Sequence, residues 1–181
     1  SFIRWFAMRS AMSLPRALPT AKQSRYRGLF REFRSTPGCA ATPAKTAATA
    51  ASNGVVRVKS VHDFETTIAL LKKDVADKGI MFFNAVDQSK LGATAGIKIN
   101  PSTLLIFGNP PLGVQFLTSN PDAGLDWPVR LLVTQDDKGQ VWAVYTDFAW
   151  IARRHHIKDR GAAFKMAAEV IASITSKVAT P

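Results

Sequence analysis

Hydrophobic and polar positions recur with clear periods over residues 53–181. Short runs that alternate, or that consist of bulky apolar residues, are typical of β-strands, whereas apolar residues three and four apart are typical of amphipathic helices. The first pattern predicts strands at 55–60, 80–87, 102–108, 129–135 and 141–147. The second predicts helices at 60–79, 148–156 and 161–178, a helical turn at 89–95 and a short helix near 113–119.

The order of these elements is strand, helix, four strands, helix. The sequence DDKGQ between the last two strands is typical of a hairpin turn. Successive strands joined in this way favour an antiparallel sheet over a doubly wound parallel one. We therefore predict an α+β fold, a two-layer sandwich with a mainly antiparallel sheet and helices on one face.

Two segments carry signals for where an element begins or ends. Ser60, with Asp63 three residues later, predicts a capped start for the first helix. The segment 109–128 reads as a long loop, in which Pro110 and Pro111 rigidly end the preceding strand. Because proline has no backbone N–H, and no Gly-Lys-Ser/Thr follows, this loop is a poor candidate for a phosphate-binding site.

The positive charge is concentrated in the first part of the chain. The 181 residues carry a formal net charge of +11, but residues 1–52 hold nine basic residues against one acidic residue, or +8, which leaves +3 for residues 53–181. The second part therefore has no charge excess that calls for a nucleic-acid partner. The single cysteine, Cys39, excludes an intramolecular disulfide, and no apolar run is long enough to predict a membrane span.

Residues 1–52 are predicted to be a basic, disordered leader and linker, followed by one α+β domain at 53–181. Arg4, Arg9 and Arg16 interrupt every candidate apolar stretch of a secretory signal peptide, so none is recognised. The Arg- and Ser-rich composition is also compatible with a transit peptide, and the compartment stays open.

Known catalytic and metal-binding patterns are missing from residues 53–181. There is no Gly-x-Ser-x-Gly motif and no cysteine nucleophile. His155 and His156 are adjacent, so on a helix they point about 100° apart and do not share a metal as an i, i+4 pair would. We therefore predict no metal and no cofactor, and we lean against an enzyme.

The segments TLLIFGNPPLG, PDAGLDWP, VW and RH, in this order, resemble the domain of unknown function 302 family, a mostly bacterial family. The resemblance covers nearly all of 54–178, with one departure: His156 stands where the family usually has glycine. It is carried by Leu105, Phe107, Gly108, Asn109, Pro110, Pro121, Gly124, Leu125, Asp126, Pro128, Val141, Trp142, Arg154 and His155.

The resemblance implies a strand–helix–four-strand–helix fold, similar in outline to half of a TATA-binding protein, and a homodimer. Many bacterial relatives look exported, and the family has no established reaction. Two functions stay open. The first is a homodimeric binding module for a small ligand or a partner protein, and the alternative is a metal-independent enzyme that uses Asp126 and His155 as an acid–base pair.

The position of the site follows from the segment 109–128, whose ends lie near strand termini. We predict that the polar side chains near those ends converge beside a tryptophan. The candidate ligand-binding residues are Asn109, Asp126, Trp127, Arg130 and His155. The alternative is that Asn109 and Asp126 hydrogen-bond only within their own loop.

Overall fold

The computed structural model describes residues 52–180, so all but the last residue of the predicted leader and linker at 1–52 lie outside the described residues. The strands are β1 (Val55–Lys59), β2 (Met81–Asp87), β3 (Ser102–Gly108), β4 (Val129–Gln135) and β5 (Val141–Thr146). The helices are α2 (Phe64–Asp77), α3 (Gln88–Thr94), α4 (Pro110–Ser119), the 3₁₀ helix η2 (Pro121–Leu125), α5 (Phe148–Arg154) and α6 (Gly161–Ala179). All five predicted strands are present, each within one residue of its predicted bounds.

The five strands form one antiparallel sheet in the order β1-β5-β4-β3-β2. Successive residues of a strand point to opposite faces, so the register decides which side chains share a face. Leu105 pairs with Leu131, and both are fully buried. Their neighbours Ile106 and Arg130, which pair with each other, therefore point to the opposite face. The predicted α+β class and the antiparallel sheet are confirmed.

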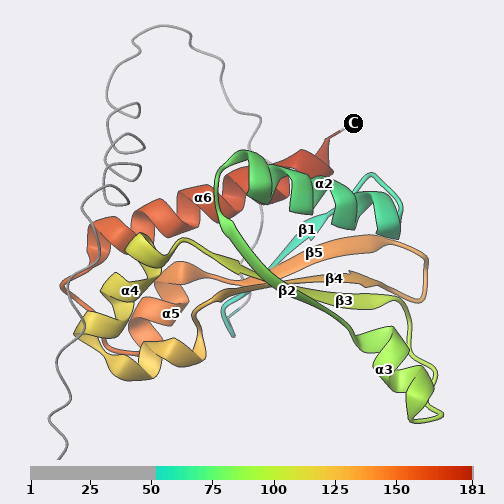
Figure 1. Ribbon diagram of the computed structural model, residues 1–181, viewed down its shortest axis with the longest axis horizontal. Coiled ribbons are helices and arrows are strands. Elements are labelled where there is room, and N and C mark those ends of the chain that lie inside the picture. The colour runs from blue at the N-terminus through green and yellow to red at the C-terminus, as the bar shows by residue number, and fades with distance from the viewer. Residues whose placement is uncertain (1–51, 181) are drawn as a thin grey trace, which may run out of the picture. The chain divides into compact units, whose positions relative to one another are not determined.

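Helices α2 and α6 cover one face of the sheet (Figure 1). The core lies between these two layers, where Leu71 and Val75 of α2 and Ile174 and Val178 of α6 are almost completely buried. The four-residue spacing within each pair matches the helical period that predicted both helices. The core extends to α4 and α5 through Phe116 of α4, whose ring stacks on Phe164 of α6 with the centroids 4.1 Å apart and lies 6.3 Å from the ring of Phe148 in α5.

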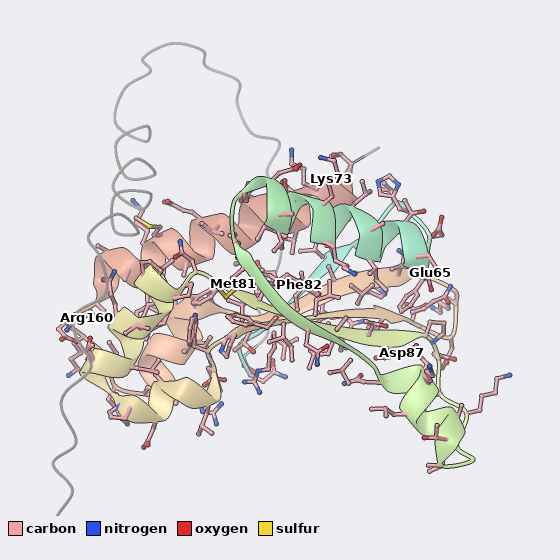
Figure 2. All side chains as sticks on the ribbon, in the orientation of Figure 1. Glu65, Lys73, Met81, Phe82, Asp87 and Arg160 are labelled. Atoms are coloured by element: carbon pink, nitrogen blue, oxygen red, sulfur yellow. The ribbon has the colours of Figure 1, made fainter. Side chains whose placement is uncertain are left out.

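The opposite face of the sheet has no helix packed over it within residues 52–180 (Figure 1). A row of half-buried apolar side chains crosses this face in register: Val86, Leu104, Leu132 and Val144. The edge strand β2 is also exposed: Phe82 packs against the core, but its neighbour Met81 remains 49% exposed (Figure 2). We call the face of the sheet without a covering helix the open face.

Two local predictions were wrong. The first helix begins after Asp63, whose carboxylate accepts a hydrogen bond from the Thr66 backbone N–H at 2.8 Å, and not after Ser60. The Ser60 hydroxyl instead lies 2.7 Å from the hydroxyl of Thr67 in the core. The segment 109–128 is mostly helical, because Pro110 and Pro111 occupy the first turn of α4, where a backbone N–H is not needed.

Candidate functional site

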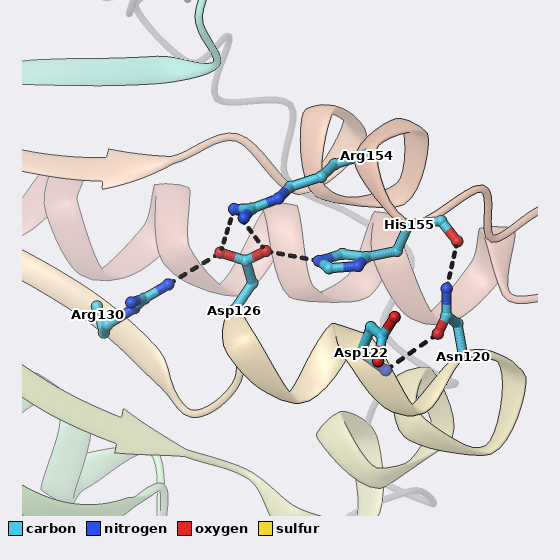
Figure 3. Close-up of polar contacts among 6 residues, drawn as sticks. All are labelled: Asn120, Asp122, Asp126, Arg130, Arg154 and His155. Atoms are coloured by element: carbon cyan, nitrogen blue, oxygen red, sulfur yellow. Dashed lines mark hydrogen bonds and ion pairs between the residues drawn. The ribbon is translucent and has the colours of Figure 1, made fainter.

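The carboxylate of Asp126 is the centre of a polar cluster (Figure 3). Its side chain is only 3% exposed. Arg130 Nη2 donates to Oδ1 at 2.9 Å, and Arg154 Nη1 lies 3.3 Å from Oδ1 and 3.2 Å from Oδ2. His155 Nε2 lies 2.6 Å from Oδ2. Because an ionised carboxylate only accepts hydrogen bonds, Nε2 carries the proton in this arrangement.

Three elements that are separate in the sequence bring the four side chains together. Asp126 is the residue at which η2 ends, Arg130 is the second residue of β4, and Arg154 and His155 end α5. The four residues form what we call the Asp126 cluster. Its exposure is uneven, since the His155 side chain is 5% exposed while those of Arg130 and Arg154 are 48% and 44% exposed.

Asn120 ties two of these elements to each other (Figure 3). Its amide Nδ2 donates to the backbone carbonyl of His155 at 2.9 Å, and its Oδ1 accepts from the backbone N–H of Asp122 at 3.0 Å. The same side chain therefore caps η2 and holds the end of α5. A second tie lies nearby, where the Ser119 hydroxyl donates to Asp159; this hydrogen bond lowers the pKa of the Asp159 carboxyl below its usual value.

The end of α5 fixes the position of His155. His156 has a positive φ of 53°, its backbone N–H donates to Arg153, and that of Ile157 donates to Ala152 at 2.9 Å. This is the Schellman arrangement, in which glycine is the favoured residue at the left-handed position. The departure from the family pattern at this position is therefore a non-glycine residue held in a glycine conformation.

We expect His156→Gly to stabilise the fold by about 0.5–1 kcal/mol, because a side chain in the left-handed region costs about 1–2 kcal/mol and glycine loses part of that gain to chain entropy. Thermal unfolding followed by circular dichroism measures the change. His156→Ala is the matched control, since it removes the imidazole but keeps the strained Cβ and should not raise the melting temperature. Equal stabilisation by both variants would contradict this explanation.

Two predicted site residues, Asn109 and Trp127, do not belong to the cluster. Asn109 is exposed at the start of α4, and its backbone carbonyl accepts from Leu112 and Gly113. Asn109 and Trp127 both line a small cavity of about 40 Å³. The other lining residues are mostly apolar and include Leu112, Gly113, Phe116, Val129 and Phe148. A site of this size holds about one or two water molecules, whereas ligand pockets are usually roughly 300–1,000 Å³.

The sequence prediction therefore named three of the four cluster residues, Asp126, Arg130 and His155, and missed Arg154. Arg154 stands in the family pattern next to His155, and this adjacency was the signal that could have found it. Asn120 was also missed, although Asn before Pro121 is a common capping sequence.

The described residues contain no group of three or more His, Cys, Asp or Glu side chains placed to hold a metal ion. None of their helices has the length and apolar composition that crossing a membrane requires.

These features define a small α+β domain with one helix-covered sheet face and a buried carboxylate at the end of the sheet. The model of the family described as "Domain of unknown function DUF302" matches residues 56–180, and the chain belongs to this family. The resemblance inferred from the sequence is thus confirmed.

A solved structure shares this fold. The crystal structure of an uncharacterized conserved DUF302 protein from Bacillus stearothermophilus superposes with a TM-score of 0.64 at 15% identity, covering 69% of this chain and 98% of that one. At this identity the similarity concerns the fold alone.

Curated relatives with a named activity match only in part. Proteins named fluoride-specific ion channel FluC 1 from Brucella suis and Brucella abortus are each 35% identical to this chain over 105 residues. The match covers 58% of this chain and 41% and 39% of those proteins. The chain thus spans about two fifths of the length of these relatives.

Proposed function

We propose that the domain is a homodimeric binding module for a small ligand, with the Asp126 cluster as its binding site. The observation that carries this proposal is the uneven exposure of the cluster. A carboxylate that is 3% exposed holds the guanidinium groups of two arginines whose side chains are nearly half exposed. Desolvating a carboxylate is costly, so ion pairs with these arginines compensate for its burial and also fix their orientation. Fixed donors at a surface are what a binding site needs.

The alternative, an enzyme that uses Asp126 and His155 as an acid–base pair, has less support. Both oxygens of Asp126 already accept hydrogen bonds from Arg130, Arg154 and His155. His155 directs Nε2 at this carboxylate, and its side chain is 5% exposed. A general acid or base must come within hydrogen-bonding distance of its substrate, and neither group reaches the surface in this arrangement.

Native mass spectrometry of the full chain, purified without denaturation, tests the ligand proposal. We expect the protein to carry an additional mass that is lost on denaturation. Arg154→Gln should lose most of this mass. Arg153→Gln, the matched control, replaces an exposed arginine of the same helix that is not part of the cluster, and it should retain the mass. A wild-type protein with no additional mass would count against a ligand-binding module.

The open face supports the dimer proposal. Leu132 and Val144 pair across β4 and β5 on this face, and Trp142 lies beside them with the guanidinium of Arg57 5.0 Å from its ring centre. A contiguous apolar surface rimmed by charged residues is typical of a protein–protein contact. Arg130 points to the same face, because it pairs with Ile106. A partner on this face would therefore lie close to the Asp126 cluster.

We expect light scattering on the full chain at micromolar concentration to give twice the monomer mass of 19.7 kDa. Leu132→Glu places a charge in the centre of the open face and should give the monomer mass. Leu125→Glu is the control, since Leu125 is 64% exposed on η2 and lies outside the open face. A monomeric wild type, or a dimer that persists in Leu132→Glu, would exclude this interface.

A further inference from the structure

The Asp126 cluster carries more positive than negative charge. Two guanidinium groups surround a single carboxylate, and they remain charged at every physiological pH. The two arginines and Asp126 therefore have a net charge of +1. The Asp126 side chain is buried and the two arginine side chains are nearly half exposed, so the cluster presents a positive surface to solvent.

Both arginines also have N–H groups that are not used in the hydrogen bonds to Asp126. A guanidinium has five N–H groups. Within residues 52–180, Arg130 donates only from Nη2 and Arg154 only from Nη1, in both cases to Asp126. Their remaining N–H groups make no hydrogen bond to the described residues. Each guanidinium is thus fixed by its bond to Asp126, and its other N–H groups are available to a ligand.

The two guanidiniums lie close enough to act on one ligand. Arg130 Nη2 and Arg154 Nη1 contact the same oxygen, Oδ1 of Asp126, at 2.9 and 3.3 Å. Arg154 is supported from a second side by Trp150, whose ring centre lies 5.5 Å from its guanidinium carbon. Trp150 is in turn held against Gly54, where an added Cβ would lie 2.3 Å from the indole. Both arginines are therefore positioned before any ligand arrives.

We propose that Arg130 and Arg154 bind a small oxyanion, the carboxylate or phosphate group of the ligand. This inference rests on the proposed function, because it names the chemical class that the binding site takes. Planar guanidinium groups match the oxygen spacing of carboxylates and phosphates and form paired, charge-assisted hydrogen bonds with them. The cavity beside Trp127, of about 40 Å³, is too small to hold the remainder of such a ligand, which would therefore lie at the surface.

NMR of the arginine Nε–Hε groups in the full chain tests the proposal with defined probes. Sodium phosphate and sodium acetate are titrated separately, with sodium chloride at equal ionic strength as the reference. We expect saturable shifts of the Arg130 and Arg154 signals with a Kd of about 1 mM or tighter for at least one of the two oxyanions. The stronger binder identifies phosphate or carboxylate as the preferred group. Sodium fluoride is a further arm, since a spherical halide cannot form paired hydrogen bonds.

Variants separate a built site from general surface charge. Arg154→Gln should weaken oxyanion binding at least about tenfold. Arg154→Lys keeps the charge that balances Asp126 but loses the planar donors, so it should fold normally and still bind more weakly than wild type. Arg153→Gln should bind like wild type. Retention of the fold is checked by the dispersion of the backbone amide signals.

The proposal is overturned if neither oxyanion gives a saturable shift, if fluoride or chloride binds as well, or if Arg154→Lys and Arg153→Gln bind alike. Native mass spectrometry tests the proposed function independently of the oxyanion titration. A retained ligand without an acidic group would leave the binding module intact and reject the oxyanion. Saturable phosphate or acetate binding with no retained ligand would support the oxyanion site and count against a ligand held in the cell.

Discussion

Replacing Asp126 by asparagine will lower the free energy of unfolding by about 2–3 kcal/mol. Removing one partner of a buried ion pair costs roughly 3–5 kcal/mol when the other charge stays buried. The cost is smaller here because Arg130 and Arg154 are nearly half exposed and water can solvate them. The remaining loss comes from His155, which is 5% exposed and keeps only an uncharged amide oxygen as its acceptor. Thermal unfolding should show a fall of roughly 5–10 °C.

Asp122→Asn is the matched control for this prediction. Asp122 lies on η2, which ends at Asp126; it is exposed, and only its backbone N–H makes a hydrogen bond here, to Asn120 outside the cluster. Its replacement should change the free energy of unfolding by less than about 0.5 kcal/mol, as is usual for surface positions. If Asp126→Asn were as harmless as Asp122→Asn, the carboxylate would not be the centre of the cluster.

Gly113→Ala should destabilise the fold by about 2–3 kcal/mol, although alanine is usually better than glycine in a helix by about 1 kcal/mol. A Cβ at position 113 would lie 1.8 Å from Nε1 and 2.0 Å from Cε2 of Trp127. The indole cannot retreat toward the sheet without crowding Gly108, whose own added Cβ would lie 3.2 Å from Nε1. Because Trp127 follows Asp126 directly, the displacement should also reduce ligand retention.

Gly124→Ala, on η2, is the control for the glycine substitution. An added Cβ there meets only Leu117, at 3.9 Å, which is ordinary van der Waals contact. Chemical unfolding should therefore separate the two variants, with Gly113→Ala clearly less stable and Gly124→Ala close to wild type. Unchanged stability and unchanged tryptophan fluorescence in Gly113→Ala would show that Trp127 is not packed against α4.

The strands could be predicted from the sequence because their signals are local. In β5, Val141 and Ala143 alternate with Trp142 and Val144, and the first pair is buried while the second lies on the open face. Helix α4 was harder to predict because Pro110 and Pro111 look like a break when they are read from the preceding strand. The same prolines fit the first turn of a helix, and the tertiary packing of Phe116 decides between the two.

The cluster could be predicted only in part, because it depends on which side chains face each other across elements. Asp126 and Arg130 are four residues apart and close to one strand end, so their proximity followed from the chain itself. Arg154 and His155 arrive from α5, and their positions depend on the Schellman turn at His156 and on Asn120, which a sequence without coordinates does not reveal. Asn109 and Trp127 lie close to the cluster in the sequence but line a cavity that no cluster residue lines.

The most direct test of the binding site is an atomic-resolution crystal structure of the full chain purified without denaturation. We expect electron density for a bound group in contact with the free N–H groups of Arg130 and Arg154. His155 and both arginines should at the same time remain within hydrogen-bonding distance of Asp126. A structure in which Asp126 keeps these three partners while only water molecules contact the outer faces of the two arginines would contradict the assignment of this cluster as a binding site.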